Sequence, residues 1–272
     1  MKKILAIVLA IAMIASVSML AACSGKGDTK STAAEDAKSD TTEKATLTMA
    51  TNAYFPPYEY YEGEKIIGID AEVAQAIADK LDMKLEIVDI EFDSIIAGVQ
   101  TGKYDMGMAG MTVTDERKQS VDFSDSYAKG IQSIIVPEDS EITSIDDILA
   151  EGAEYKLGVQ LSTTGDLYIS DDYEAAGKSA DLITEFQTGN DAVAALSTGK
   201  VDAVIIDNEP AKSYVAASSG LKILDTEYVA EDYAICFAKD NTELKDKVNG
   251  ALKELIADGT VKSIIDKYIK AE

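Results

Sequence analysis

The chain has 272 residues, of which 46% are hydrophobic, and this is enough for one large domain or two smaller ones. Its formal net charge of −24 argues against binding to nucleic acid or to an anionic membrane surface, because both are negatively charged. The sequence has no histidine, which excludes a histidine-dependent catalytic triad and removes the commonest metal ligand. No D-x-D-x-D-G calcium loop is present either, and we expect neither a metal nor a cofactor.

The first 22 residues have the pattern of a secretory signal peptide. Lys2 and Lys3 precede an apolar run over residues 4–19, which is short for a transmembrane helix. The segment Leu20-Ala21-Ala22-Cys23 resembles the lipobox of bacterial lipoproteins, which implies cleavage before Cys23 and a lipid on its thiol. A plain secretory cleavage site is the alternative. Residues 23–44 contain no large apolar side chain, and they predict a disordered tether.

From about Ala45 onward, hydrophobic periodicity predicts alternating strands and helices. The predicted elements of the first half are a strand over 46–51, a loop over 52–58, a helix that begins after Gly68-Ile69-Asp70 and buries Val73, Ala74, Ile77, Ala78 and Leu81, a strand over 84–88, a helix capped by Asp93 that runs to Val99, and a buried strand over 106–110. Loops and strands alternating with helices in this way are typical of an α/β fold.

A short internal repeat divides the sequence into two similar parts. Residues 97–105 read as a helix end, a Thr-Gly-Lys turn and an aspartate, and a buried strand follows. Residues 194–202 repeat that order before the strand at 203–207, with a glycine as the helix stop in both copies. A chance match of T-G-K-x-D is the alternative. The shared order around it predicts two similar α/β lobes.

The remaining segments continue the pattern. The predicted elements are a strand over 131–137, a helix over 144–149 capped by Ser144, a strand over 156–160, a loop over 161–166 that opens a helix, a strand-like run over 233–238, a helix with apolar positions from Val248 to Ile256 that ends at Gly259, and a helix over 261–269. Cys236 lies in the apolar run, where a lone cysteine is expected to pack as a small core residue.

Arg117 is the only arginine among 25 basic residues. Lysine suffices for surface charge, whereas the planar fork of arginine grips a carboxylate or phosphate through two parallel hydrogen bonds. The simpler alternative is an intramolecular ion pair, or a helix-surface charge next to Asp115 and Glu116. The position favours a ligand, because Gly110 ends a buried strand just before it and α/β folds bind ligands at the carboxyl ends of strands.

Asp207 ends the corresponding strand of the second copy. It would therefore lie at the equivalent edge of the other lobe, although a helix cap is an alternative role for its side chain. With Arg117 it offers one cation and one anion. A ligand that carries both charges, such as an amino acid, fits between them.

From about Thr46 to Tyr268 the chain resembles the polar amino-acid binding proteins of bacterial ABC importers, solute-binding protein family 3, which includes glutamine and lysine/arginine/ornithine binders. The motifs that carry the resemblance are Ala50-Thr51-Asn52 to Pro56-Pro57-Tyr58-Glu59, Gly68-Ile69-Asp70, Phe92-Asp93-Ser94-Ile95-Ile96, Gly110-Met111-Thr112-Val113-Thr114-Asp115-Glu116-Arg117, Asp122-Phe123-Ser124, Gly158-Val159-Gln160 to Thr163-Thr164-Gly165, and Asp202-Ala203-Val204 to Asp207. The resemblance implies a type II periplasmic-binding-protein fold, in which two α/β lobes, each a sheet flanked by helices, are joined by two hinge strands. It places the first lobe at 45–130 and 230–272 and the second at 131–229.

The resemblance also implies the roles of individual residues. The α-carboxylate of the ligand would bind Arg117 and the main-chain N–H groups of Thr112 and Thr164. Its α-ammonium would meet the Gly110 carbonyl, the Thr112 hydroxyl and Asp207. The further residues expected at the site are Phe55 and Phe92 on either side of the ligand side chain, with Tyr54, Asn52, Ala109, Gln160 and Thr163 nearby.

Three departures from the family pattern bear on the substrate. Asn52 stands where the family often has an aspartate that binds a distal cation, which favours a neutral side chain such as glutamine unless Glu59 or Glu209 supplies the acid. Ile206 stands where glutamine binders can have a histidine, and Ser162 replaces a usual glycine.

The resemblance implies a binding protein that delivers an L-amino acid to an ABC permease, and no enzyme. The acidic composition is compatible with a monomer, and the lipobox implies a membrane anchor at Cys23. The alternatives are a binder of arginine or lysine, an enzyme similar to cyclohexadienyl dehydratases on the same fold, and a sensory protein that acts with a partner.

Overall fold

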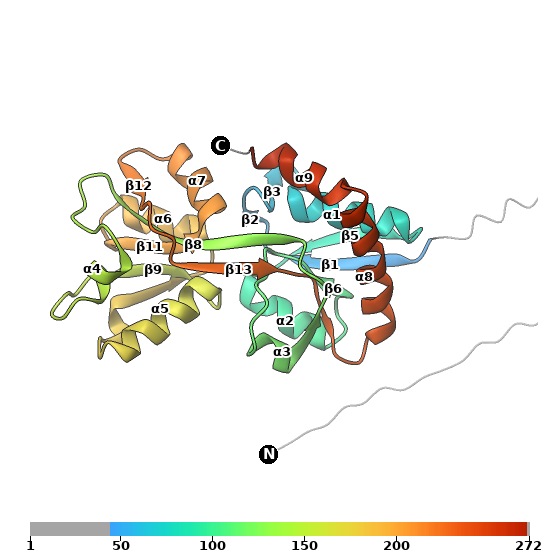
Figure 1. Cartoon of the computed structure of the whole chain (residues 1–272), viewed down its shortest axis with the longest axis horizontal. Coiled ribbons are helices and arrows are strands. Elements are labelled where there is room, and N and C mark those ends of the chain that lie inside the picture. Colours follow the sequence, from blue (N-terminus) through green and yellow to red (C-terminus); the bar gives the residue numbers. More distant parts are fainter. Residues whose placement is uncertain (1–43, 271–272) are drawn as a thin grey trace, which may run out of the picture. The chain divides into compact units, whose positions relative to one another are not determined.

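The computed structural model describes residues 44–270. The predicted signal peptide, the lipidation of Cys23 and the tether up to residue 43 lie outside the described residues. Within the described part of the chain, no helix is long and apolar enough to cross a membrane. Figure 1 shows the helices and strands in their order along the chain.

The first sheet has five strands in the order β5-β1-β6-β14-β7. Its strands are β1 (Thr46–Thr51), β5 (Lys84–Asp89), β6 (Met106–Gly107), β7 (Val121–Phe123) and β14 (Cys236–Ala238). β1 pairs in parallel with β5 and β6, whereas β14 pairs antiparallel with β6 and β7. The strand from the end of the chain therefore completes the sheet begun at its start.

The helices that flank this sheet also come from both ends of the chain. They are α1 (Ile69–Lys80), α2 (Phe92–Gln100), α3 (Arg117–Ser120), α8 (Thr242–Ala257) and α9 (Thr260–Tyr268), and a small sheet of β2 (Tyr54–Phe55), β3 (Glu59–Glu62) and β4 (Lys65–Ile67) precedes α1. The predicted apolar face of α1 is buried, and Lys80 of α1 forms an ion pair with Glu254 of α8 at 2.8 Å. The helix over 93–99 begins at Phe92, and Asp93 makes no cap because the N-cap residue is Glu91.

The second sheet has the order β10-β9-β11-β8-β12, with β13 paired to β8. Its strands are β8 (Ala128–Pro137), β9 (Leu157–Gln160), β10 (Ile183–Phe186), β11 (Ala203–Asp207), β12 (Leu221–Ile223) and β13 (Val229–Tyr233). The elements around them are α4 (Ile145–Leu149), α5 (Thr164–Ala175), the 3₁₀ turn η1 (Ala180–Leu182), α6 (Gly189–Ser197) and α7 (Asn208–Ala217). Ser144 begins α4 with the predicted cap, which is a full capping box with Asp147.

Two antiparallel strands connect the sheets. β8 leads from the first sheet into the second, and β13 returns beside it with Ala128 opposite Tyr233 and Gln132 opposite Val229 (Figure 1). The chain thus passes from a first lobe to a second and back, with β8 and β13 as hinge strands. The predicted two-lobed α/β architecture is confirmed, and the exact lobe boundaries stay a prediction.

The internal repeat corresponds to equivalent structures. α2 and α6 are each followed by a left-handed glycine, Gly102 with φ 69° and Gly199 with φ 68°, and then by a strand of the lobe's sheet. Asp105 accepts a hydrogen bond from the Thr48 main-chain N–H at 2.7 Å, and Asp202 accepts one from the Lys156 N–H at 2.8 Å. In both lobes the aspartate therefore ties the turn to the neighbouring strand.

Cys236 is fully buried, as predicted, and lies in an apolar cluster of the first lobe with Ile95, Val99 and Met111. Burial raises the pKa of its thiol to about 12. The thiol therefore stays protonated at neutral pH, and the side chain packs as part of the hydrophobic core.

Gly68 fixes the entry to α1. Its φ is 125°, and a Cβ there would lie 2.2 Å from the carbonyl oxygen of Tyr58. We expect Gly68→Ala to lower the free energy of unfolding by about 2–4 kcal/mol, since backbone strain and a main-chain clash add. Thermal melting against Gly63→Ala checks this, because Gly63 also has a positive φ but open space around its Cβ. Equal losses in the two variants would contradict the steric explanation.

Candidate functional site

A pocket lies at the carboxyl ends of the parallel strands of both sheets. Asn52 follows β1, Phe92 follows β5, and Gly110 follows β6; Gln160 and Asp207 end β9 and β11. The lining residues are Asn52, Phe55, Glu59, Phe92, Ala109, Gly110, Thr112, Arg117, Gln160, Thr163, Thr164 and Asp207. Twelve residues were predicted from the sequence to lie at the ligand site, and all of them except Tyr54 line this pocket.

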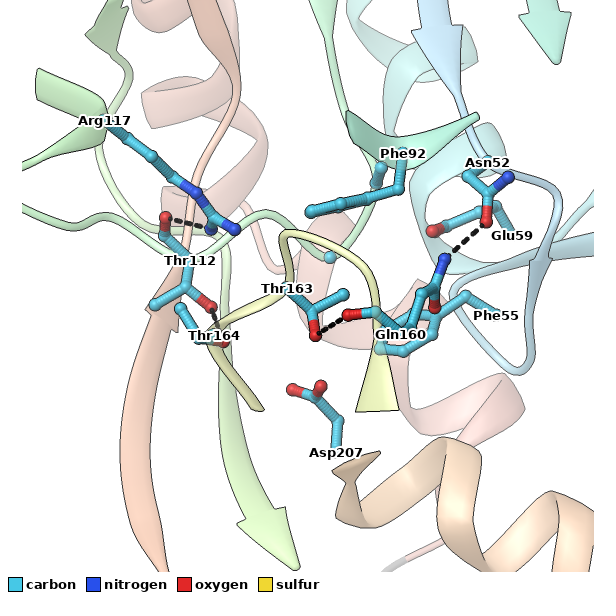
Figure 2. Close-up of a pocket in the computed structure, with 12 residues that line it drawn as sticks. Asn52, Phe55, Glu59, Phe92, Thr112, Arg117, Gln160, Thr163, Thr164 and Asp207 are labelled. Carbon is cyan, nitrogen blue, oxygen red and sulfur yellow. Dashed lines mark hydrogen bonds between the residues drawn. The ribbon is translucent and has the colours of Figure 1, made fainter. Parts of the chain in front are cut away.

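Arg117 is buried at one end of the pocket (Figure 2). Its guanidinium donates to the Thr112 carbonyl at 2.8 Å and to the Ser162 carbonyl at 3.0 Å, and it lies 5.4 Å from the centre of the Phe92 ring. Asp115 pairs instead with Lys118 at 3.0 Å. The alternative of an ion pair between Arg117 and Asp115 is therefore wrong, and main-chain carbonyls hold the guanidinium at the pocket.

Asp207 lies on another side of the pocket, at the end of β11. Its carboxylate accepts hydrogen bonds from the Gln132 amide at 2.8 Å and from the Tyr233 hydroxyl, both on hinge strands. Although Asp207 occupies the N-cap position of α7, its side chain makes no capping hydrogen bond, so the cap alternative is wrong. Burial, followed by the charge of Glu231, raises the pKa of Asp207 well above the usual carboxyl range.

Gly110 is fixed by a buried carboxylate behind it. Asp70 of α1 accepts hydrogen bonds from the Gly110 main-chain N–H and from the Tyr127 hydroxyl, both at 2.8 Å. A Cβ on Gly110 would lie 2.7 Å from the Phe55 ring, so only glycine lets this backbone approach the aromatic wall. Asp70 thereby positions the main chain at the end of β6.

Asn52, Gln160 and Glu59 lie together at the end of the pocket away from Arg117 (Figure 2). The Gln160 amide donates to the Asn52 carbonyl oxygen at 3.0 Å, and the Asn52 amide donates to the Ile90 carbonyl at 2.9 Å. Glu59 is only 1% exposed, and no donor group of the described residues reaches either of its carboxylate oxygens. Its carboxyl group faces that of Asp70, and a hydrogen bond joins the two when Glu59 carries a proton. This end therefore holds a carboxyl group with unused hydrogen-bonding capacity.

The predicted aromatic residues divide into two groups. Phe55 and Phe92 line the pocket, whereas the Tyr54 side chain is 46% exposed and lies outside the lining set. The main-chain carbonyl of Tyr54 instead accepts a hydrogen bond from the Tyr214 hydroxyl of the second lobe. Its contribution is thus a contact between lobes.

Several hydrogen bonds cross the pocket between the lobes. Arg117 reaches Ser162, Gln160 reaches Asn52, and the hydroxyls of Thr112 and Thr164 are 3.4 Å apart. Ser162 has a φ of 61°, which is the left-handed conformation that favours glycine, so serine stands at a position where a glycine would be less strained. The Ser162 N–H is held by the Asp166 carboxylate at 2.9 Å. Thr163 caps α5, whose N-terminus faces the pocket.

Sequence reasoning missed the groups that support the site from behind. Gln132 bridges Asp207 and Glu231, at 2.8 Å and 3.0 Å, across the two hinge strands. Asp70 holds Gly110 and Tyr127, although it is part of a motif already noted in the sequence. From the sequence, Glu59 was considered only as an alternative acid for a cation on the ligand. Its position directly after Pro56-Pro57-Tyr58 was the signal that could have placed it at the pocket.

Together, the fold and the pocket define a two-lobed α/β protein that binds a small ligand between its lobes. Residues 47–271 match the family model described as bacterial extracellular solute-binding proteins, family 3, and the chain belongs to this family. An arginine-binding extracellular protein, ArtP of Bacillus subtilis (strain 168), is 34% identical over 84% of this chain and 88% of its own length.

Solved structures agree with this assignment. An ancestral arginine-binding protein bound to arginine has a TM-score of 0.76 and is 38% identical, with 83% of this chain and 99% of that chain covered. An ancestral arginine-binding protein bound to glutamine has a TM-score of 0.76 at 37% identity, with 84% and 99% covered. The curated relatives are named as binding proteins, and this chain is a binding protein and not an enzyme.

Proposed function

We propose that the protein captures a polar L-amino acid between its lobes and delivers it to the permease of an ABC importer. The observation that carries this proposal is the placement of Arg117 and Asp207, one cation and one anion, in a single buried pocket. A zwitterionic amino acid presents the complementary pair of charges. The α-carboxylate would bind Arg117 and the N–H groups of Thr112 and Thr164, and the α-ammonium would bind Asp207, the Gly110 carbonyl and the Thr112 hydroxyl.

The ligand side chain would extend between Phe55 and Phe92 towards Asn52, Gln160 and Glu59. Asn52 alone favours a neutral side chain, because an amide cannot neutralise a cation. Glu59 adds a buried acid at the same end, and no donor of the described residues reaches its oxygens, which favours a long cationic side chain such as that of arginine. We place arginine first and glutamine second. Relatives named for either amino acid support this class of substrate.

Binding would work through closure of the lobes. Arg117 and the Gly110 carbonyl belong to the first lobe, whereas Thr164 and Asp207 belong to the second. A ligand contacts all of them only when the lobes are together, so it shifts the population towards the closed state. The permease would then recognise that state. Lipid anchoring at Cys23, a monomeric state and a location outside the cytoplasm complete the proposal.

Calorimetric titration of the purified protein against the twenty amino acids tests this function. We expect arginine, lysine or glutamine to bind with a Kd of about 1 μM or tighter, which corresponds to roughly −8 kcal/mol. Tight binding of glutamine alone would support the preference drawn from Asn52. Binding of none of the twenty would overturn the proposed function, and recovery of chemically altered ligand would restore the enzyme alternative.

A further inference from the structure

Among the described residues that line the pocket, Glu59 is the one whose two buried side-chain oxygens receive no hydrogen bond from a donor, and its carboxyl group faces the acid Asp70. It begins β3, and Figure 2 shows its carboxyl group beside Asn52, across the pocket from Arg117. The neighbouring amides of Asn52 and Gln160 are engaged with each other and with the Ile90 and Gln187 carbonyls. Of the polar groups at this end, Glu59 is therefore the one left to respond to the ligand.

Among the described residues, the charges recorded as acting on Glu59 are all negative. The groups whose charges act on it or are affected by it are acids and phenols: Asp70 on α1, Asp89 on β5, Asp207 on β11, and Tyr58, Tyr127 and Tyr214. Asp70 is itself fully buried and has one unpartnered oxygen. Burial, followed by the charge of Asp70, raises the pKa of Glu59 well above its usual value.

An ionised carboxylate at this position would be costly, because it is desolvated and unpaired. Two events remove that cost. A proton neutralises the carboxyl group, or a cation of the ligand pairs with the carboxylate. The two are mutually exclusive, since a protonated carboxyl group gives little attraction to a cation.

We propose that Glu59 determines which side-chain charge the site accepts, and that it does so by exchanging its proton for the cationic end of the ligand. This rests on the proposed function. With a neutral polar side chain, Glu59 keeps its proton and acts as a neutral hydrogen-bonding group. With a guanidinium or ammonium side chain, the O–H bond of Glu59 breaks, the proton leaves to solvent, and the carboxylate pairs with the cation.

The exchange makes selectivity depend on pH in a defined direction. Binding of a cationic side chain releases a proton at any pH below the raised pKa of Glu59 in the ligand-free protein. Its affinity therefore rises with pH over that range, by up to about tenfold per pH unit, and becomes constant above it. A neutral side chain leaves the proton of Glu59 in place, so Glu59 adds no pH dependence to the affinity for such a ligand.

Protonation of Asp207, at the α-ammonium end of the pocket, must be distinguished from protonation of Glu59. The pKa of Asp207 is also raised, and Asp207 lies near Glu231. L-Arginine and L-citrulline provide the separation. The two amino acids have the same α-carboxylate, α-ammonium and chain length. Arginine ends in a charged guanidinium, whereas citrulline ends in an uncharged ureido group. Proton exchange at Asp207 is common to both ligands, and so the difference between the two ligands reports Glu59.

Calorimetric titration of the purified full chain with each ligand, in buffers of different ionisation enthalpy between pH 5.5 and 7.5, gives the number of protons released. We expect arginine to release more protons than citrulline, by up to one, and the ratio of their affinities to rise with pH. Glu59→Gln is expected to remove both differences. Glu62→Gln, an exposed residue of the same strand, is the matched control and should keep them.

The possible failures are distinct. Equal proton release for arginine and citrulline in the wild-type chain, with a ratio of affinities independent of pH, would overturn the role of Glu59 while the amino-acid function stands. Binding of neutral amino acids without arginine or lysine at any of these pH values would overturn it as well. Absence of binding for all twenty amino acids would instead remove the proposed function. The wild-type comparison needs no variant, so misfolding of Glu59→Gln leaves the test intact.

Discussion

Replacing Arg117 by lysine is expected to weaken amino-acid binding by a factor of about ten or more, even though the charge is kept. A factor of ten corresponds to about 1.4 kcal/mol, which is near the value of one charge-assisted hydrogen bond. Lysine cannot hold the Thr112 and Ser162 carbonyls and also grip a carboxylate through two parallel bonds, because it has no planar fork. It would also lose the stacking of the guanidinium on Phe92.

Arg117→Gln is expected to cost more, because it also removes the charge that faces the α-carboxylate. Loss of one partner of a buried charged pair costs roughly 2–5 kcal/mol, or about 30-fold to several thousandfold in Kd. Lys118→Ala is the matched control, since Lys118 is the next residue of α3 and its ion pair with Asp115 is exposed. Calorimetry with the best ligand of the wild-type protein checks all three variants. Unchanged affinity in Arg117→Lys would show that the fork is not used.

Much of the fold could be predicted from the sequence because the relevant signals are local. Alternating apolar residues predicted β1 and β9, and the i, i+3, i+4 spacing predicted α1 and α8. The Thr-Gly-Lys turns identified two equivalent structures, since a glycine that ends a helix with a positive φ leaves a local signature. The exact ends of the helices and strands were predicted less accurately than their existence. The helix α2, for example, begins one residue before the predicted cap at Asp93.

The pocket could be predicted in outline for a different reason. Its residues follow strand ends or begin helices, so their sequence positions specify one edge of each sheet. What surrounds those residues depends on long-range packing. The partners of Asp207 are 75 and 26 residues away, at Gln132 and Tyr233, and no local pattern links them. The acidic surroundings of Glu59 are likewise a property of the assembled pocket, because its neighbour Asp70 comes from another segment and no local pattern links the two.

Asp207→Asn is expected to reduce amino-acid affinity by about 30-fold or more at pH 7, corresponding to roughly 2 kcal/mol or more. An asparagine keeps the shape of the side chain but cannot pair with the α-ammonium as an anion. The fold should tolerate the change: the new carbonyl can accept from Tyr233, and rotation of the Gln132 amide brings its unpartnered oxygen to the new amide. Removal of a buried ionisable group is also expected to leave the Tm of the ligand-free protein no lower.

The pH dependence of the affinity distinguishes this role from a merely structural one. In the ligand-free protein, burial and the charge of Glu231 keep the pKa of Asp207 high, so at acidic pH the ammonium must displace a proton. Affinity for a neutral amino acid should therefore rise between pH 5 and 7 in the wild-type chain and become flatter in Asp207→Asn. Glu209→Gln, two residues further along in the first turn of α7, makes the same change of charge outside the pocket and should retain the wild-type profile. A profile in Asp207→Asn as steep as that of the wild-type chain would assign the proton to another group.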